Sequence, residues 1–514
     1  MHLPGLRGDL TARVASEIPG ASTVSESTDK RAKLRICVIG AGCSGILALV
    51  QLKSRGFTRL TAFEKGADVG GTWWFNRYPG IACDVPSLAY QYSFCLRTHW
   101  SHHYASGDQI QRYIGEVADQ FDVRRHVQFG EEVTSAVYEE GRWLIETRSG
   151  RKESFDVVIS AVGFLHHPKV PVIDGASSFE GFQAHSRDLP ADYPLGRKRV
   201  GIIGTGSTAV QLVTAVAPIA DRLTVFQRTA QWILPLPQGP ITEDLRATFD
   251  DEAARRREYD RLNLEHNSTF AAAVVNENPE AYRYLSDACR NNLQETIRDP
   301  VLRAKLTPDY EVGCKRLVMA QGFYEALQRP NVDVVTEKIS AIDARGILTA
   351  DGTHHALDVI VYATGFDVHA PYGTTRVIGK GGMALSEAWK DGASAYKQVM
   401  MASFPNWFML GGPGSPIGNF SFLFTAEHQC RLILDLIELL VESGAKEIGA
   451  RKEAQVAFNE ARAERMKNTV WMSGCTSWYL DKNGNIPFWP WSYQKFQDDM
   501  NNLVREDFEI LGRS

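Results

Sequence analysis

One local pattern occurs twice in this chain: an apolar strand, a glycine-rich turn, an apolar helix and a second strand. The first copy has strands at 35–39 and 60–64 around the turn Gly-Ala-Gly-Cys-Ser-Gly at 40–45. The second copy has strands at 199–203 and 223–227 around the turn Gly-Thr-Gly-Ser-Thr-Ala at 204–209. Such a turn brings the N–H groups and partial positive charge of a helix N-terminus to a bound pyrophosphate. We therefore expect an α/β fold with two doubly wound, Rossmann-like dinucleotide-binding domains.

The residue at the end of each second strand distinguishes the two nucleotides. Glu64 follows Gly45 by nineteen positions, and Arg228 follows Ala209 by the same number. A carboxylate there accepts hydrogen bonds from ribose hydroxyls, whereas an arginine pairs with a 2′-phosphate. Either residue alone is also compatible with an ordinary surface charge, but the matched spacing favours FAD at the first turn and NADPH at the second.

The residues around the two turns are the predicted nucleotide contacts. For FAD they are Gly40, Gly42, Ser44, Gly45, Glu64 and Lys65. For NADPH they are Thr205, Gly206, Ser207, Thr208, Gln211, Arg228 and Thr229, of which Thr229 adds a hydroxyl to the 2′-phosphate.

The chain has 514 residues, enough for two or three domains. We predict a flexible N-terminal arm at 1–32, which lacks the apolar core of a signal peptide, and a helical insertion at 235–310, where Glu, Arg, Ala and Asn recur at helical spacing. The FAD-binding domain is assigned to 33–167 and 371–514, and the NADPH-binding domain to 168–234 and 311–370. Two strands that end in glycine, at 156–163 and 358–365, are expected to carry the chain between these domains.

Composition excludes several other classes of protein. The formal net charge is −5 and no basic block occurs, so neither nucleic acid nor an anionic membrane is an expected partner. The apolar stretch at 426–443 is interrupted by Arg431, Asp435, Glu438 and Glu442 and is too short to span a bilayer. None of the eight cysteines forms a Cys-x-x-Cys pair, so we expect reduced thiols in a soluble, cytoplasmic protein, without a disulfide framework or structural zinc. The His pairs at 102–103, 166–167 and 354–355 lack ligand partners at metal spacing, so no metal is expected.

A longer motif follows the first βαβ unit. Gly71, Trp73, Tyr78, Pro79, Gly80 and Asp84 meet every fixed position of Gly-x-Trp-x4-Tyr/Phe-Pro-Gly-x3-Asp. The segment resembles the Baeyer–Villiger monooxygenases, the class B flavoprotein monooxygenases. Their second pattern, Phe-x-Gly-x3-His-x3-Trp-Pro/Asp, is met by Phe179, Gly181, His185 and Pro190, with Leu189 where tryptophan is usual. Shorter matches lie at 226–229, 313–317, 404–406, 412–416 and 474–480.

The resemblance implies a chemistry and a set of roles. In this family NADPH reduces FAD, and the C4a-peroxyflavin formed with O2 gives one oxygen atom to a small organic substrate. By resemblance, Arg316 is the fixed cation that stabilises the anionic peroxide, and Asp84 orients it. The resemblance also places Gly71, Thr72, Trp73 and Asp84 at FAD, Lys315 at the 2′-phosphate, and Trp478 on a mobile loop over the nicotinamide. His185 is expected to be structural.

Several functions stay open at this point. Oxygen insertion beside a ketone, giving an ester or lactone, is favoured by the Asp84/Arg316 pair. Leu189 leaves room for N- or S-oxygenation of an aromatic heterocycle, for example phenazine-type N-oxidation in secondary metabolism. An NADPH-dependent disulfide reductase would need a cysteine pair beside the flavin, and a non-catalytic redox sensor would not need Arg316. Neither the substrate nor the oligomeric state can be read from these residues.

Overall fold

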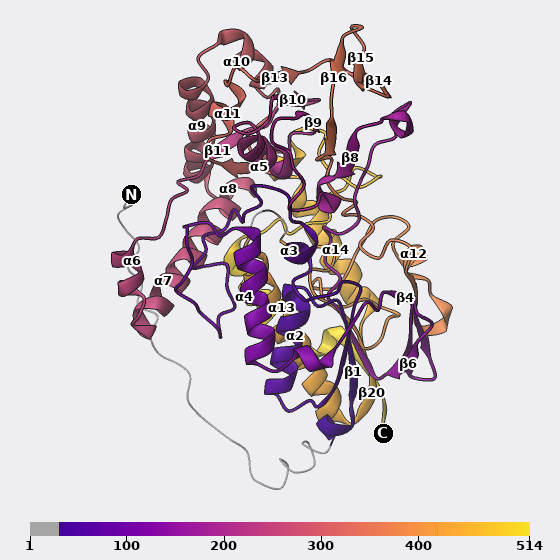
Figure 1. Cartoon of the computed structure of the whole chain (residues 1–514). Coiled ribbons are helices and arrows are strands. Elements are labelled where there is room, and N and C mark those ends of the chain that lie inside the picture. Colours follow the sequence, from indigo (N-terminus) through magenta and orange to yellow (C-terminus); the bar gives the residue numbers. More distant parts are fainter. Residues whose placement is uncertain (1–29, 417, 419, 514) are drawn as a thin grey trace.

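Two five-stranded parallel sheets form the frame of the protein, one in each of two lobes (Figure 1). The computed structural model describes residues 30–513 except 417 and 419. The sheet orders are β19-β7-β1-β2-β3 in the lower lobe and β13-β10-β9-β17-β8 in the upper lobe. Every pairing within both sheets is parallel, and helices follow β1, β2 and β9, so the predicted pair of doubly wound α/β units is confirmed.

The lower sheet contains the first glycine-rich turn. Its strands are β1 (Arg35–Ile39), β2 (Arg59–Glu64), β3 (Val127–Phe129), β7 (Val157–Ser160) and β19 (Trp407–Met409). Helices α2 (Cys43–Ser54), α4 (Gly107–Gln120) and α13 (Phe422–Ser443) pack beside one another in this lobe. Strands β7 and β19 are buried at every residue, as expected for a parallel sheet that is covered on both faces.

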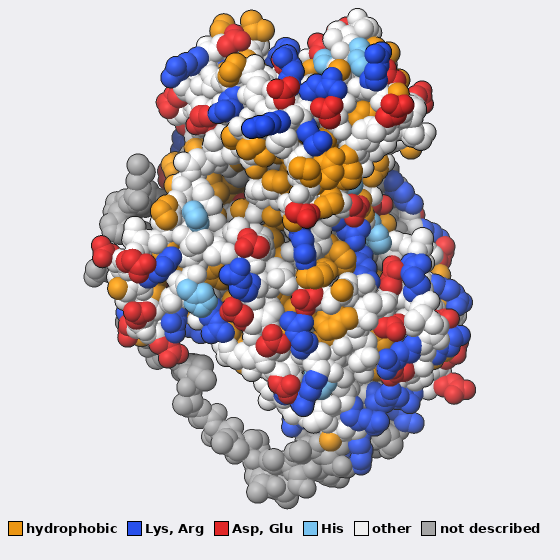
Figure 2. All heavy atoms as spheres, in the orientation of Figure 1, with side chains coloured by type: hydrophobic (Ala, Val, Ile, Leu, Met, Phe, Trp, Pro, Cys, Tyr) orange, Lys and Arg blue, Asp and Glu red, His pale blue; other side chains and the backbone are white. Residues whose placement is uncertain are grey.

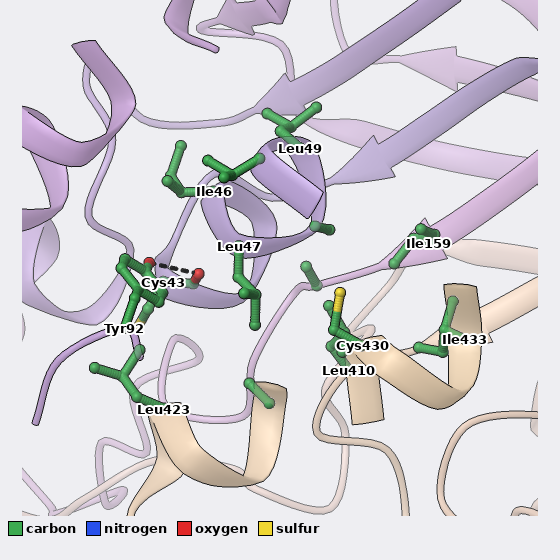
Figure 3. Close-up of a cluster of buried hydrophobic side chains, with 14 of the residues drawn as sticks. Cys43, Ile46, Leu47, Leu49, Tyr92, Ile159, Leu410, Leu423, Cys430 and Ile433 are labelled. Atoms are coloured by element: carbon green, nitrogen blue, oxygen red, sulfur yellow. Dashed lines mark hydrogen bonds between the residues drawn. The ribbon is translucent and has the colours of Figure 1, made fainter. Parts of the chain in front are cut away.

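The core of the lower lobe joins segments from distant parts of the chain. Figure 3 shows Leu47 of α2 pointing toward Leu423 and Cys430 of α13, and each of the three is 1% exposed. The Tyr92 hydroxyl donates a hydrogen bond of 2.7 Å to the carbonyl oxygen of Cys43 at the edge of this cluster. The apolar stretch at 426–443 is therefore a core helix. Among the described residues, no helix is long and apolar enough to cross a membrane.

The upper sheet contains the second glycine-rich turn. Its strands are β8 (Phe182–His185), β9 (Arg199–Ile203), β10 (Arg222–Phe226), β13 (Val332–Val335) and β17 (Val359–Tyr362). Helix α5 (Ser207–Val216) follows the turn and contacts α11 (Phe323–Leu327). On the face in Figure 2, basic and acidic side chains are interspersed, and hydrophobic side chains gather where the two lobes meet.

The segment between the two halves of the upper lobe is helical, as predicted. It comprises α6 (Glu243–Thr248), α7 (Glu252–Glu265), a π-helix η4 (His266–Phe270), α8 (Ala271–Val274), α9 (Pro279–Thr296) and α10 (Pro300–Leu306). Asp251, Asn278 and Asp299 cap α7, α9 and α10 with side-chain hydrogen bonds. Strands β11 (Ile233–Pro235) and β12 (Val318–Ala320) pair with each other, so the insertion leaves and rejoins the lobe at one place.

Smaller elements complete the two lobes. Strands β4 (Val133–Glu139), β5 (Arg142–Thr147), β6 (Lys152–Phe155) and β18 (Arg376–Ile378) form one sheet; β14 (Ile339–Asp343), β15 (Gly346–Thr349) and β16 (His354–Ala356) form another. Strand β20 (Ala445–Ala450) pairs with β21 (Phe508–Arg513). The remaining α-helices are α3 (Thr72–Phe75), α12 (Leu385–Ala388), α14 (Lys452–Met466) and α15 (Tyr493–Asn501). Of the predicted arm, residues 1–29 lie outside the described part of the chain, and residues 30–33 form one helical turn.

A disulfide corrects one expectation from the sequence. Cys314 and Cys475 are bonded to each other, with their Cα atoms 6.2 Å apart, so these two cysteines are not reduced thiols. They are 161 positions apart in sequence, and only the folded chain brings their loops together. The other six cysteines are buried free thiols.

Candidate functional site

The first glycine-rich turn borders a pocket of about 980 Å³. The backbone of Gly71 crosses that of Gly42 so closely that a Cβ on Gly71 would lie 2.9 Å from the Gly42 Cα. This contact keeps the turn free of side chains, as a pyrophosphate site requires. Predicted FAD residues that line the pocket are Gly40, Gly42, Ser44, Glu64, Lys65, Gly71 and Thr72.

Polar groups in this pocket suit a dinucleotide. The buried Glu64 accepts hydrogen bonds from the N–H groups of Ala41 (2.7 Å) and Gly66 (2.6 Å), which hold the carboxylate beside the turn. Its remaining lone pairs can accept from ribose hydroxyls. The Ser44 hydroxyl is buried, faces no hydrogen-bond partner among the described residues, and lies where α2 begins. The chemistry of this lining therefore suits FAD.

Two predicted FAD residues have a packing role in this structure. Trp73 points its indole N–H at the Tyr90 hydroxyl, 3.3 Å away, and packs against the lower-lobe core. Gly45 lies against the carbonyl of Gly40, where a Cβ would be only 1.9 Å from the oxygen, so it brings α2 close to β1. Lys65 does line the pocket, and its ammonium lies 3.1 Å from Nδ1 of His166.

The second turn lies beside two cations. Arg228 follows β10 and is exposed, and Lys315 is half-buried with its ammonium 4.4 Å from the centre of the Tyr310 ring. Burial lowers the pKa of Lys315; Asp309 acts to raise it, and Arg228 lowers it further. Within the described part of the chain, neither Arg228 nor Lys315 forms an ion pair. Two nearby unpaired cations suit a 2′-phosphate.

The helix after the second turn also contacts the lower lobe. The Tyr78 hydroxyl donates to Oε1 of Gln211 at 2.9 Å and lies 3.3 Å from the Thr208 hydroxyl. The amide of Gln211 donates to the carbonyl oxygen of Ala82 at 2.9 Å. Gln211 and Thr208, both predicted at NADPH, thus form hydrogen bonds across the lobe interface. Thr205 donates to the carbonyl oxygen of Thr229 at 2.8 Å, which orders the two NADPH-side segments against each other.

Asp84 and Arg316 meet where the lobes join. Asp84 lies on the segment after α3, Arg316 lies just before β12, and a guanidinium nitrogen is 2.6 Å from the carboxylate. Burial favours the neutral form of Asp84, but the charge and hydrogen bond of Arg316 outweigh it and hold the pKa of Asp84 below its ordinary value. Asp84 in turn raises the pKa of Arg316. The pair is a fixed carboxylate and a fixed cation.

Three residues beside this pair carry no role from the sequence motifs. His266 begins the π-helix and is within electrostatic reach of both charges; burial lowers its pKa, Asp84 opposes that and Arg316 adds to it. A Cβ on Gly418 would lie 2.5 Å from the Tyr479 hydroxyl oxygen and 3.0 Å from a guanidinium nitrogen of Arg316. Tyr479 and Gly418 therefore lie directly against the arginine. Tyr479 lies within the matched segment 474–480, which was the available signal for it. Gly418 lies two positions beyond the matched segment 412–416. His266 had no signal, although π-helices often mark functional sites.

In the part of the chain that the structure describes, the motif residues Trp478, His185 and Leu189 form no hydrogen bond or ion pair with Asp84 or Arg316, and they contact other segments. Trp478 is 40% exposed, and its carbonyl oxygen is 2.9 Å from Nε2 of His369. His185 is buried, with one ring nitrogen 3.0 Å from the Gly365 carbonyl oxygen and the other accepting from the Arg187 N–H. Both nitrogens bond to backbone, which fits the expected structural role. Leu189 is buried in the upper-lobe core.

Two parallel-sheet nucleotide sites and a carboxylate–guanidinium pair between them define a two-dinucleotide flavoprotein. Comparison with known proteins narrows this class. Residues 33–238 match the family model described as flavin-binding monooxygenase-like. A Baeyer–Villiger monooxygenase of Streptomyces coelicolor is 38% identical over 483 residues, which cover 93% of each chain. One of Pseudomonas aeruginosa is 33% identical and covers 89% of this chain and 87% of its own.

Solved structures give the same assignment. The closed crystal structure of cyclohexanone monooxygenase matches with a TM-score of 0.84 at 30% identity, covering 93% of this chain and 99% of that one. An oxidised steroid monooxygenase bound to NADP matches with a TM-score of 0.84 at 31% identity and the same coverage. This chain belongs to the Baeyer–Villiger monooxygenase family. It is an FAD- and NADPH-dependent flavoprotein monooxygenase.

Proposed function

We propose that the enzyme catalyses Baeyer–Villiger oxidation of a ketone, inserting one oxygen atom from O2 beside the carbonyl carbon to give an ester or lactone. The observation that carries this proposal is the Asp84–Arg316 pair at 2.6 Å. Nucleophilic attack on a carbonyl needs an anionic oxygen species, and an arginine that cannot lose its proton stabilises such an anion. Bound FAD supplies the oxygen activation, and NADPH supplies the reducing equivalents.

The protein contributes by positioning a fixed positive charge, the guanidinium of Arg316, and by binding NADPH. In this proposal Arg316 faces the reacting oxygen, and Asp84 keeps the guanidinium in one orientation through their hydrogen bond. Arg228 and Lys315 bind the 2′-phosphate of NADPH. Trp478 closes over the nicotinamide and excludes water. Relatives support the substrate class: cyclohexanone monooxygenase, matched with a TM-score of 0.82, has been solved with cyclohexanone and with ε-caprolactone bound.

A second candidate, oxygenation of nitrogen or sulfur in an aromatic heterocycle, rests on Leu189. This residue is 2% exposed in the upper-lobe core, where the family motif has tryptophan. The indole of the family motif is therefore absent here, and Leu189 contributes only apolar packing to the segment that follows β8.

One product assay separates the two candidates. The enzyme is supplied with NADPH, O2 and a cyclic ketone, a thioether or an aromatic N-heterocycle, and both products and hydrogen peroxide are measured. Lactone as the main product supports the proposal, and its loss in Arg316→Ala with FAD still bound supports the role of the arginine. N-oxide or sulfoxide without lactone would establish the second candidate instead. Arg316→Ala with unchanged lactone formation would remove Arg316 from the mechanism.

We propose that the chain divides into an FAD-binding domain (33–167 and 371–514), an NADPH-binding domain (168–234 and 311–370) and a helical insertion (235–310). The strand composition of the two sheets and the bounds of α6–α10 support this division. We also propose a cytoplasmic location, because six of the eight cysteines are free thiols.

A further inference from the structure

The disulfide joins the two loops that carry residues of the candidate site. Cys314 is two positions before Arg316, and Cys475 is three positions before Trp478 and four before Tyr479. Their Cα separation of 6.2 Å lies in the range of ordinary disulfides. The bond thus fixes the segment before β12 to the C-terminal aromatic loop.

The two sulfur atoms differ in accessibility. Cys314 is fully buried, whereas Cys475 is half-buried on a loop whose neighbouring residues 472–474 and 476 are exposed. An external thiolate therefore reaches the sulfur of Cys475 first. Cys314 Sγ lies 3.8 Å from the carbonyl oxygen of Trp471, which can accept a hydrogen bond from the thiol once the bond is broken.

The tethered loop packs against Arg316. Tyr479 is 1% exposed, its ring centre is 4.8 Å from that of Phe488, and its hydroxyl lies with the guanidinium of Arg316 around Gly418. Trp478 precedes it with a ring-centre separation of 4.5 Å. A shift of the loop therefore moves the tyrosine that limits where the arginine can go.

We propose that the Cys314–Cys475 disulfide positions the Trp478–Tyr479 loop against Arg316 and can be reduced by a dithiol reductant, for which it is a modification site. The consequence for oxygenation rests on the proposed function of Arg316; the reducible bond itself does not. Disulfides of proteins in reducing compartments are usually redox-sensing or catalytic, which agrees with a bond between one half-buried and one fully buried cysteine.

The chemistry is thiol–disulfide exchange. A thiolate of the reductant attacks Sγ of Cys475, the bond to Cys314 breaks, and the Cys314 thiolate takes up a proton. The second thiol of the reductant then attacks the mixed disulfide, which releases Cys475 as a thiol and leaves the reductant as a disulfide. Two electrons and two protons pass from the dithiol to the protein, and added oxidised glutathione reverses the exchange.

Other contacts keep this region folded after reduction. Arg465 donates to the carbonyl oxygen of Val275 at 2.6 Å, and Asn276 donates to the carbonyl oxygen of Asn468 at 2.8 Å. Both join the C-terminal end of α14 and the residues just after it to the helical insertion, independently of the disulfide. We therefore expect reduction to loosen the loop at 473–480 and to leave both lobes intact.

The first experiment maps thiols in the native holoenzyme. Protein with and without dithiothreitol is alkylated, digested and analysed by mass spectrometry. Dithiothreitol should make Cys475 reactive, and Cys314 as well, because reduction loosens the loop at 473–480 that covers it. The other six cysteines are buried in segments outside this loop and should stay unlabelled. The proposal is overturned if both are already labelled without reductant or if neither is labelled with it. It is also overturned if NADPH alone, under anaerobic conditions, frees both thiols, because the electrons would then come from the enzyme itself.

The second experiment measures the ratio of oxygenated product to NADPH consumed, with a cyclic ketone. Reduction of the wild type, or Cys475→Ser, should lower this ratio by roughly tenfold while FAD stays bound, since small displacements of positioned groups have large effects on rate. Oxidised glutathione should restore the reduced wild type and have no effect on Cys475→Ser. Cys289→Ser, a buried free cysteine of α9, should keep the response of the wild type to dithiothreitol.

The outcomes also separate this inference from the proposed function. An unchanged ratio in reduced wild type and in Cys475→Ser would refute the positioning role. If the oxidised enzyme forms no lactone, the proposed function fails, but the thiol map still decides whether the bond is reducible.

Discussion

A glycine of the family motif offers a measurement of how tightly the two lobes pack. Gly80 has a backbone φ of +82°, and a Cβ placed on it would lie 2.7 Å from the carbonyl oxygen of Gln211 and 2.9 Å from the Cβ of Ala215. Both atoms are fixed to helix α5 of the upper lobe: one is a backbone oxygen and the other is a Cβ. Neither can move aside as the end of a flexible side chain would. Gly80→Ala should force the lobes apart locally.

The magnitude follows from two separate terms. An L-residue at positive φ costs about 1 kcal/mol. Overpacking a close contact costs about 1–3 kcal/mol more. We therefore expect Gly80→Ala to destabilise the protein by roughly 2–4 kcal/mol. Because Tyr78, two residues earlier, bonds to Gln211, the displacement should also disturb the helix at the second glycine-rich turn and raise the KM for NADPH.

The chain provides a matched control. Gly56 has φ +85°, and a Cβ there meets no atom within 4 Å. Gly56→Ala should lose only the backbone term of about 1 kcal/mol, with an unchanged KM for NADPH. Urea unfolding followed by flavin fluorescence and by far-UV circular dichroism, together with initial rates at varied NADPH, measures both effects. Equal destabilisation of the two variants would show that the lobes do not pack closely at Gly80 and would refute the reasoning.

Three further changes have expected outcomes. Arg228→Ala should raise the KM for NADPH by roughly 10- to 100-fold, because a charge-assisted phosphate bond is lost. The KM for NADH should be unchanged. Equal effects on both coenzymes in initial-rate assays would exclude a 2′-phosphate contact. Asp84→Asn should lower the lactone formation rate by about 10²-fold or more, because Arg316 loses the charge that orients it; a rate within twofold of wild type would contradict this role. Glu427 has its pKa raised from 4.5 to about 7 by burial, so the folded state binds its proton more tightly than the unfolded state, and stability is lost as pH rises from about 4.5 to about 7. In chemical denaturation, the free energy of unfolding of Glu427→Gln should therefore exceed that of the wild type by on the order of 3 kcal/mol at pH 8 and equal it at pH 4.5. The same difference at both pH values would argue against this titration.

Local sequence was sufficient for the parts of the site that lie within one βαβ unit. The strand at 35–39 and the helix at 207–216 have the predicted bounds or nearly so, since hydrophobic periodicity and glycine turns are local properties. The matched Glu64 and Arg228 predicted FAD and NADPH because each residue lies in the same βαβ unit as its glycine-rich turn. The motif ending at Asp84 gave the family for the same reason.

The tertiary structure decided what depends on residues far apart in the chain. Asp84 and Arg316 are 232 positions apart and come within 2.6 Å only when the lobes dock. The Tyr78–Gln211 bond, the approach of Tyr479 to Arg316 and the Cys314–Cys475 disulfide likewise cross between distant segments. Periodicity and spacing report on neighbours along the chain, whereas these contacts are fixed by how two independently patterned sheets pack against each other. The sequence alone thus determined which cofactors are bound, and the packing of the lobes determined which side chains surround the arginine between them.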